Sequence, residues 1–439
     1  MTGTGSLTKY FTRLRSISGH RWQGSVTQVL GSMIESSGPF CASGDACEIL
    51  DPTGVAYAGQ ILGFRGNTVL SMTFDPPRNV RFGDRVVTWG ARPQVRVGKS
   101  LIGRVIDALG EPLDGGPAYD AEATRELETG APQPFERELI SDTLACGVRA
   151  IDGMLTCGRG QRMGIFGGSG VGKSTLVGIM ARNTSADVTV LALIGERGRE
   201  VREFLEHSLG EAGRRRSVVV VSTSDQTPLL RLRGALAATT IAEHFCHQGK
   251  NVLLVVDSLT RLAMAQREIS LMAGEPPTSK GYTPSVFSLM ARLIERAGKF
   301  STGSITAFYT VLMEGDDQQD PIVDTARALL DGHIMLDRRL AIQNHYPPIS
   351  VLDSVSRLMP SVCAPAHLEK AGELRQLLAA YSAAEDLVRI GAYQKGADST
   401  LDIALEVLPE LRNFLRQEPG ESPQFDQTRA QLLDLGCKK

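Results

Sequence analysis

Residues 167–174 read Gly-Gly-Ser-Gly-Val-Gly-Lys-Ser, which matches the phosphate-loop pattern G-x-x-x-x-G-K-[ST]. An apolar run, Met163–Phe166, precedes this stretch and a helix-like run, Ser174–Arg182, follows it, so the motif has the strand–loop–helix setting that it requires. Backbone N–H groups of such a loop converge on phosphate oxygens, and the helix N-terminus adds positive potential. The stretch therefore predicts a nucleoside triphosphate site rather than a glycine-rich surface turn.

Two side chains of the loop have roles of their own. Lys173 supplies a mobile cation for the phosphates, and the hydroxyl of Ser174 can bind Mg²⁺. The predicted nucleotide-binding residues are the whole loop and the residue after it: Gly167, Gly168, Ser169, Gly170, Val171, Gly172, Lys173, Ser174 and Thr175.

The composition is that of an ordinary globular protein. Of the 439 residues 42% are apolar and 22% charged, and the length predicts about three domains. A formal net charge of −2 argues against nonspecific nucleic-acid binding, which needs an excess of Lys and Arg. The seven cysteines are scattered, which favours free thiols in a reducing compartment and predicts a cytoplasmic protein. We expect neither a membrane span nor a secretory signal.

Residues 1–20 have the pattern of a basic amphipathic helix. Apolar side chains fall at helical spacing on one face, and basic side chains lie off that face. The pattern leaves open whether the helix docks on its own domain or is offered to a partner or a membrane surface. The apolar positions are Leu7, Tyr10, Phe11, Leu14 and Ile17.

Residues 21–92 contain short apolar runs that recur between glycine turns, without helical stretches. This even spacing predicts a small β-barrel. The runs are Val26–Leu30, Ala46–Leu50, Val55–Phe64, Thr68–Phe74 and Arg85–Trp89.

Residues 93–364 begin with a linker-like region rich in Gly and Pro, between residues 110 and 134, after which the pattern changes. Continuous apolar runs then alternate with helical candidates, which predicts an α/β fold with a parallel sheet covered on both faces. The expected strands are Met163–Phe166, Val188–Ile194, Ser217–Val221, Val252–Val256, Ser304–Leu312 and His333–Leu336, and the expected helices are Arg199–Leu209, Leu229–His247 and Leu259–Met272. Residues 365–439 show a helical pattern only.

Two of the expected strands end in carboxylates. Asp257 follows Val252–Val256, so a parallel sheet places it beside the phosphate loop, where it can hold Mg²⁺ as well as cap the next helix. Glu196 follows Val188–Ile194 and can polarise an attacking water, with Arg197 positioning the nucleotide. The residues alone leave open whether residues 195–200 are only a solvated turn, and whether Arg261 faces the pocket or the surface.

Several longer motifs follow one another in order. Gly-Arg-Gly-Gln-Arg-Met-Gly-Ile-Phe (158–166) and the phosphate loop precede Ile-Gly-Glu-Arg-Gly-Arg-Glu-Val (194–201) and Asp-Ser-Leu-Thr-Arg (257–261). With them the chain resembles the protein-export ATPases of bacterial flagella and type III secretion systems, relatives of the rotary ATP synthase catalytic subunit. Residues 303–322 resemble the flagellar branch more than the injectisome branch.

The resemblance implies a RecA-like P-loop ATPase core with an N-terminal β-barrel and a C-terminal helical domain. It implies that Glu196 activates water, that Lys173, Arg197 and Arg261 surround the phosphates of ATP, and that Ser174 and Asp257 serve Mg²⁺. Val-Ser-Arg-Leu-Met (355–359) resembles the arginine-finger segment, so Arg357 would reach a neighbouring subunit's nucleotide.

Two tyrosines are implied at the adenine side. His-Tyr-Pro-Pro-Ile (345–349) resembles the adenine-side loop, which makes Tyr346 a stacking candidate. Gly-Ala-Tyr-Gln-Lys-Gly (391–396) matches another family motif and gives Tyr393 as a second candidate, with ordinary packing as the alternative for both rings.

The resemblance also implies partners: a homohexamer, a peripheral-stalk regulator, a central-stalk protein, an export gate and chaperone–cargo complexes. It implies peripheral contact with the inner membrane through residues 1–20, and no nucleic acid. Rival functions are an injectisome ATPase, a hexameric RNA translocase, the ATP synthase catalytic subunit and a non-hydrolytic regulatory subunit. The acidic Glu196 argues against the last of these.

Overall fold

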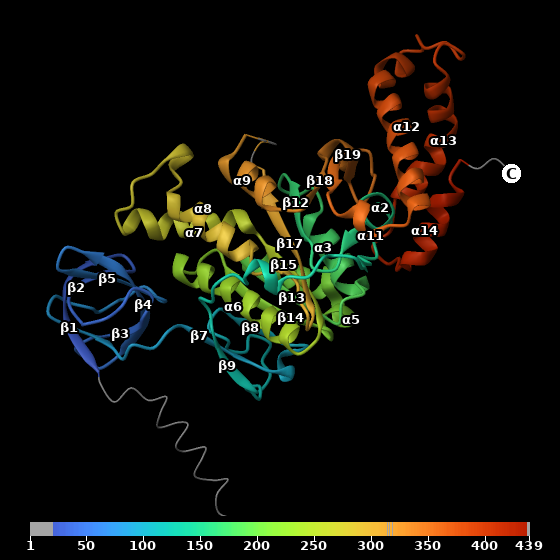
Figure 1. Cartoon of the computed structure of the whole chain (residues 1–439). Coiled ribbons are helices and arrows are strands. Elements are labelled where there is room, and N and C mark those ends of the chain that lie inside the picture. Colours follow the sequence, from blue (N-terminus) through green and yellow to red (C-terminus); the bar gives the residue numbers. More distant parts are fainter. Residues whose placement is uncertain (1–20, 314, 316, 318, 437–439) are drawn as a thin grey trace, which may run out of the picture.

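A computed structural model describes residues 21–313, 315, 317 and 319–436 (Figure 1). The helix predicted over residues 1–20 lies outside the described residues. The barrel lies at one end of the molecule, a helix-covered sheet in the middle and a helical hairpin at the other end (Figure 1).

The N-terminal region forms a closed barrel with strand order β1-β2-β5-β4-β3-β6, which confirms the barrel prediction. Apolar side chains that alternate along the strands fill its interior, among them Val26, Ile49 and Val86. Strand β2 was not predicted, because its sequence Met-Ile-Glu-Ser-Ser lacks an apolar run. The strands are β1 Trp22–Leu30, β2 Met33–Ser37, β3 Ala46–Leu50, β4 Ala56–Arg65, β5 Thr68–Thr73 and β6 Arg85–Thr88.

The central sheet has the order β19-β18-β12-β17-β15-β13-β14-β8. All neighbours along this order are parallel except β18 and β19, so the parallel sheet predicted from continuous apolar runs is confirmed. Its strands are β8 Val105–Asp107, β12 Arg162–Gly167, β13 Val188–Glu196, β14 Ser217–Thr223, β15 Asn251–Asp257, β17 Ser304–Leu312, β18 Gly332–Leu336 and β19 Ile349–Ser356. The short β16, Gly298–Lys299, pairs antiparallel with β17.

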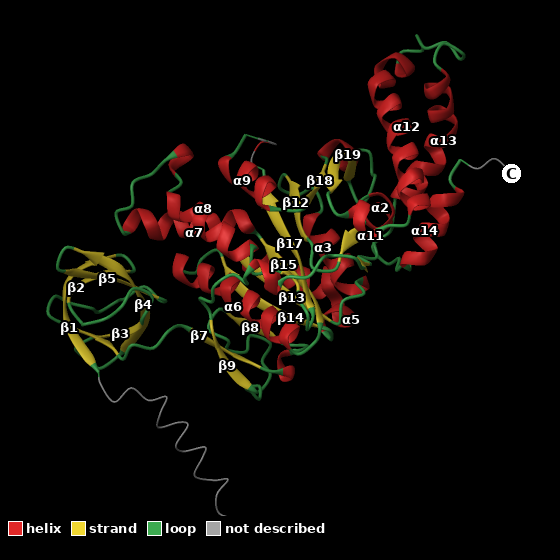
Figure 2. Cartoon of the chain, viewed as in Figure 1, coloured by secondary structure: helices red, strands yellow, loops and turns green. Residues whose placement is uncertain are grey.

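Helices cover both faces of this sheet (Figure 2). One apolar cluster unites the sheet with α3 and the C-terminal helices, and another unites the opposite face with α6 to α9. The helices are α2 Arg149–Met154, α3 Lys173–Asn183, α4 Gly198–Glu203, α5 Gly210–Arg214, α6 Pro228–His247, α7 Leu259–Met272, α8 Pro284–Ile294, α9 Pro321–Leu329, α10 Arg338–Ile342 and α11 Met359–Val362. Between α4 and α5 the chain continues as a π-helical turn, η3 Phe204–Leu209.

The region predicted to be linker-like between residues 110 and 134 is more ordered than expected. Just before it, β8 joins the central sheet beside β14, and β7 (Gln94–Val97) pairs with β9 (Ala123–Glu126), which lies inside it. These strands have only three or four residues, too few for a recognisable period. Short 3₁₀ turns are η1 Lys99–Leu101, η2 Pro134–Glu136 and η4 Ser279–Gly281, and β10 Thr143–Leu144 pairs with β11 Cys157–Gly158.

The C-terminal region is helical, as predicted, with α12 Pro365–Arg389, α13 Ser399–Leu415 and α14 Phe425–Asp434. Arg149 at the start of α2 attaches this region to the core. Its Nε donates to the carbonyl of Phe414 at 2.9 Å, and its backbone N–H donates to Oε1 of Gln417, also at 2.9 Å.

Candidate functional site

The phosphate loop connects β12 to α3 at the carboxyl edge of the sheet. Gly172 has φ 97°, a left-handed conformation that favours glycine, and it precedes the first residue of α3. The ammonium of Lys173 folds back over the loop, with Nζ 2.9 Å from the carbonyl oxygen of Gly167 and 2.7 Å from that of Gly168. Burial lowers the pKa of Lys173 to about 8.

A cavity of about 400 Å³ opens in front of this loop. Residues from the ends of β13 and β15, and from α4 and α7, close it opposite the loop, as expected where the carboxyl ends of parallel strands meet. Its lining is Ser169, Gly170, Gly172, Lys173, Ser174, Thr175, Glu196, Arg197, Glu200, Asp257, Arg261 and Leu312.

Glu196 reaches this cavity through an irregularity in β13. The pairing of β13 with β14 shifts between Ile194 and Glu196, and the intervening Gly195 has φ 72°. A side chain at Gly195 would also meet Arg261 at about 3.0 Å. Burial raises the pKa of the Glu196 carboxyl to about 7, and the neighbouring Asp257 adds to the shift. Such a carboxyl is suited to proton transfer near neutral pH.

Asp257 is a buried carboxyl at the end of β15. Its Oδ1 accepts a hydrogen bond of 2.5 Å from the hydroxyl of Thr310, a fully buried residue of β17. Burial raises the pKa of Asp257, while Thr310, Lys173 and Arg261 favour its ionised form. The result is an acceptor in a fixed orientation that faces the phosphate loop.

The two arginines of the site differ in their burial and in their hydrogen-bond partners. The Nε of Arg261 is buried and has no hydrogen-bond partner among the described residues, and a phosphate oxygen would satisfy it. The Arg197 side chain is 74% exposed, and the nearest atoms of its ion pair with Glu200 are 3.9 Å apart, so it is free to turn toward a ligand.

The structure places the two tyrosines in different regions. Tyr346 lies beside the phosphate loop, because a methyl group on Gly172 would lie 3.9 Å from Tyr346 Cε1. Tyr393 lies between α12 and α13, where its hydroxyl donates to Asp402 Oδ1 at 2.9 Å, and it does not line the phosphate cavity. Neither ring lines the phosphate cavity, and Tyr346 is the one that lies beside its loop.

Arg357 lies at the other edge of the sheet. Its backbone N–H donates to the carbonyl of Asp331 at 3.0 Å, and Asp331 also binds Arg162, the first residue of β12. The phosphate loop begins at Gly167, the last residue of that strand. Arg162 and Gly167 are five residues apart along this strand, a distance of about 17 Å. Arg357 therefore does not reach the phosphate cavity of its own chain.

Family models match most of the chain. Residues 147–356 match the nucleotide-binding domain of the ATP synthase alpha/beta family, and residues 363–434 match the T3SS EscN ATPase C-terminal domain. The "Flagellum-specific ATP synthase" of Bacillus subtilis is 49% identical over 94% of this chain and 94% of its own length. This chain belongs to the ATP synthase alpha/beta family, in its type III export branch.

Solved structures agree with this assignment. The assembled ATPase EscN of the enteropathogenic E. coli type III secretion system is 42% identical, with a TM-score of 0.88 over 94% of this chain and all of EscN. EscN in complex with its central stalk EscO gives a TM-score of 0.87 over 94% of this chain and all of that chain, at 41% identity. Like its relatives this chain is an ATPase of the export family.

The described part of this export ATPase contains further His, Cys, Asp and Glu side chains outside the phosphate cavity. No set of three or more His, Cys, Asp or Glu side chains there is arranged to hold a metal ion, and the six described cysteines are free thiols. His244 packs edge-on against Phe245 within α6. Within the same part, no helix is both long and apolar enough to cross a membrane.

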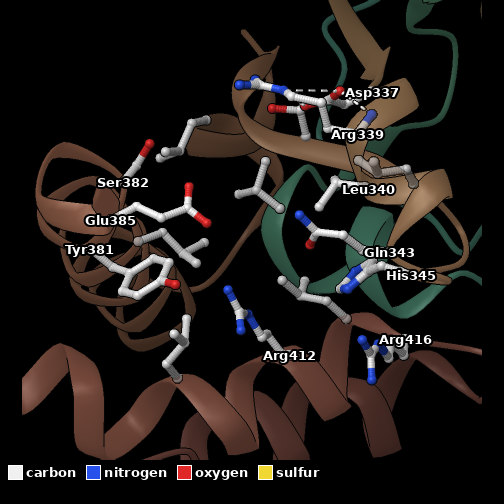
Figure 3. Close-up of a pocket in the computed structure, with 17 residues that line it drawn as sticks. Asp337, Arg339, Leu340, Gln343, His345, Tyr381, Ser382, Glu385, Arg412 and Arg416 are labelled. Carbon is white, nitrogen blue, oxygen red and sulfur yellow. Dashed lines mark hydrogen bonds and ion pairs between the residues drawn. The ribbon is translucent and has the colours of Figure 1, made fainter. Parts of the chain in front are cut away.

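A second cavity, of about 210 Å³, lies between the ATPase core and the C-terminal helices. Figure 3 shows the side chains of Gln343, Glu385 and Arg412 directed into it, and it shares no lining residue with the phosphate cavity. The guanidinium of Arg412 lies 5.1 Å from the centre of the Tyr381 ring. Burial lowers the pKa of His345, which also lines this cavity, to about 4, so this imidazole is neutral at pH 7.

Three contributors to the site were not predicted. Glu200 of α4 lines the phosphate cavity four residues after Glu196, the last residue of β13, and its acidic side chain close to Glu196 in the sequence was the available signal. Thr310 and Leu312 lie inside an apolar strand, β17, where nothing in the sequence distinguishes them. They reach the site because β17 lies between β15 and β12, where Leu312 pairs with Gly167.

Proposed function

We propose that this chain is a Mg²⁺-dependent ATPase of flagellar protein export whose active site is completed by a second copy. The observation that carries the proposal is Glu196, a carboxyl with a pKa raised to about 7 in the cavity of the phosphate loop. At neutral pH a group with this pKa accepts and returns a proton readily. The export role is proposed from the names of the relatives.

The reaction that these residues serve is in-line attack of water on the γ-phosphate of ATP. Glu196 would orient the water and accept its hydrogen bond. Lys173, released from the carbonyls of Gly167 and Gly168, would bind phosphate oxygens, together with the exposed Arg197 and the buried Nε of Arg261. Tyr346 would contact the adenine through its 43% exposed ring.

Ser174 and Asp257 would hold Mg²⁺. The fit is supported by the buried acceptor of Asp257 and by the hydroxyl of Ser174 in the same cavity. Two oxygen side chains suit this ion, which keeps several waters and binds phosphate oxygens rather than an all-protein cage. The chemistry that Mg²⁺ supplies when bound is neutralisation of charge on the β- and γ-phosphates.

Arg357 is proposed as the finger from the neighbouring copy. Its position about 17 Å along β12 from the phosphate loop supports this role, because a residue at the opposite edge can act only on another subunit's nucleotide. An arginine supplied in trans is typically worth about 10³ to 10⁵ in rate.

The proposed partners follow the family. A central-stalk partner is supported by the EscN–EscO complex. We also propose a peripheral-stalk regulator, an export gate, chaperone–cargo complexes, and peripheral membrane contact through residues 1–20 on the cytoplasmic side. The flagellar assignment is supported by the 49% identity with the Bacillus subtilis protein, against 45% with the "Type 3 secretion system ATPase" of Xanthomonas euvesicatoria, and injectisome export is the alternative. Co-purification from cells tests it, because flagellar or injectisome components would accompany the chain.

The test of the ATPase site is Glu196→Gln. Nucleotide affinity should remain within about 3-fold of wild type, while turnover falls by at least about 100-fold, because general-base catalysis contributes 10²- to 10⁴-fold. Glu206→Gln is the matched control, since Glu206 is exposed and pairs with Arg202 outside the phosphate cavity. Turnover of Glu196→Gln comparable to wild type would refute the assignment.

A further inference from the structure

Two large apolar side chains protrude from the segment that leads into the ATPase core. Phe135 and Leu139 are 102% and 91% exposed, the highest values among the large apolar residues that the structure describes. They lie four residues apart in residues 133–140, which we name the strap. Burying both side chains would remove a large apolar surface from water, which is favourable.

The strap is held firmly to the core. The Arg137 guanidinium donates to the carbonyl of Ala297 at 2.9 Å and to Oε2 of Glu295 at 3.0 Å. The N–H of Glu138 donates to the carbonyl of Lys299 at 2.9 Å. Both apolar side chains are thus presented by ordered backbone, and a partner that covers them has little further chain to order.

The strap lies on the same edge of the sheet as Arg357. A chain of direct contacts connects the two: Lys299 bonds the strap and lies against Gly160, and Arg162 binds Asp331, whose carbonyl accepts from Arg357. Four steps between neighbouring backbone segments, each of about 5 Å, and the two-residue step from Gly160 to Arg162 place Leu139 within roughly 30 Å of Arg357.

The contact that delivers Arg357 to another copy must be head-to-tail, because Arg357 and the phosphate loop occupy opposite edges of the chain. A standard interface buries about 800 Å² on each partner, a patch about 30 Å across. A patch of that size on this edge of the sheet has room for both Arg357 and the strap.

We propose that Phe135 and Leu139 are apolar anchors of the contact between neighbouring copies, and that the occupant of this surface is a second copy of this chain. The inference rests on the proposed function, because it uses the interface that brings Arg357 to a neighbour. It adds the surface that stabilises that interface.

The test is thiol labelling of Phe135→Cys in the full chain, as an isolated chain and in the ring assembled with a non-hydrolysable ATP analogue. The maleimide labelling rate at residue 135 should fall at least 10-fold on assembly, after subtraction of the wild-type rate. Ile390→Cys is the matched control, since Ile390 is 75% exposed at the end of α12, and its rate should change less than 3-fold. Equal rates for residue 135 in both states would overturn the proposal.

A second measurement uses Phe135→Ser combined with Leu139→Ser, surface changes that leave the fold intact. The protein concentration at the midpoint of ring assembly should rise at least 10-fold, with nucleotide affinity of the isolated chain unchanged. An unchanged midpoint would contradict the anchor role. If residue 135 is protected but Arg357→Ala retains full activity, the shared active site fails while the anchor contact stands.

Discussion

The hydroxyl of Thr310 donates to Asp257 Oδ1 across a distance of 2.5 Å, and both side chains are buried. Asp257 is the last residue of β15 and Thr310 lies two residues before the end of β17, and the pairing of these neighbouring strands brings the two together. The bond fixes one carboxylate oxygen and leaves the other free for the cavity in front of the phosphate loop. Asp257 is thus held in one orientation before any nucleotide arrives.

Thr310→Val should weaken the response to Mg²⁺. The substitution keeps the shape of the side chain but removes a hydrogen bond to a charged group, worth about 1.5 to 3 kcal/mol. We expect the Mg²⁺ concentration for half-maximal ATPase activity to rise about 10-fold or more. Thr189→Val is the matched control, because Thr189 is a buried threonine of β13 whose hydroxyl has no partner among the described residues. An unchanged Mg²⁺ requirement in Thr310→Val would contradict the role given to this bond.

The pH dependence of kcat/KM should be bell-shaped with its maximum between about pH 7 and 8. Glu196 must be ionised to accept a proton, so activity falls below its pKa of about 7. Lys173 must be protonated to bind phosphate, so activity falls above its pKa of about 8. In Lys173→Arg the alkaline limb should disappear from the residual activity, because arginine stays protonated. A wild-type acid limb near pH 4.5, the ordinary range of a glutamate, would contradict the raised pKa of Glu196.

The substitution Arg296→Met should lower the free energy of unfolding. Arg296 is 2% exposed and donates twice to the Glu243 carboxylate, at 2.6 and 2.7 Å, and also to the Leu127 carbonyl and the Thr240 hydroxyl. Removing one partner of such a pair costs about 3 to 5 kcal/mol. The free energy of unfolding in urea measures this loss.

The control for that measurement is Arg202→Met. Arg202 also pairs with a glutamate, Glu206, at 2.8 Å, but its side chain is 81% exposed. An exposed pair of this kind is worth at most about 1 kcal/mol. Equal losses of unfolding free energy in the two variants would show that burial of the Arg296 pair does not matter.

The elements around the phosphate loop were predictable from the sequence because their patterns are local. Continuous apolar runs identified β17 and β15, and the apolar and capping pattern identified α7 as Leu259–Met272. β2 and β8 were missed because each is stabilised by its sheet neighbours rather than by an apolar run of its own.

The site was predictable where a motif carries its own chemistry. Six of the nine predicted loop residues and the carboxyls that end strands, Glu196 and Asp257, line one cavity, whereas Gly167, Gly168 and Val171 do not line it. Thr310 could not be found, since a threonine in a buried strand has no signal until strand order is known. Tyr393 was implied by a motif resemblance alone; its hydroxyl bonds Asp402 in the helical hairpin, and its contact with adenine stays a prediction.

The central claim, that one active site is divided between two copies, is tested most directly by mixing two inactive variants. Lys173→Ala lacks the loop cation, and Arg357→Ala lacks the finger at the opposite edge. In mixed rings some interfaces pair an intact loop with an intact finger. We predict that ATPase activity appears on mixing and rises with the fraction of such interfaces. Mixed rings that assemble, as shown by light scattering, yet hydrolyse no more ATP than either variant alone would contradict it.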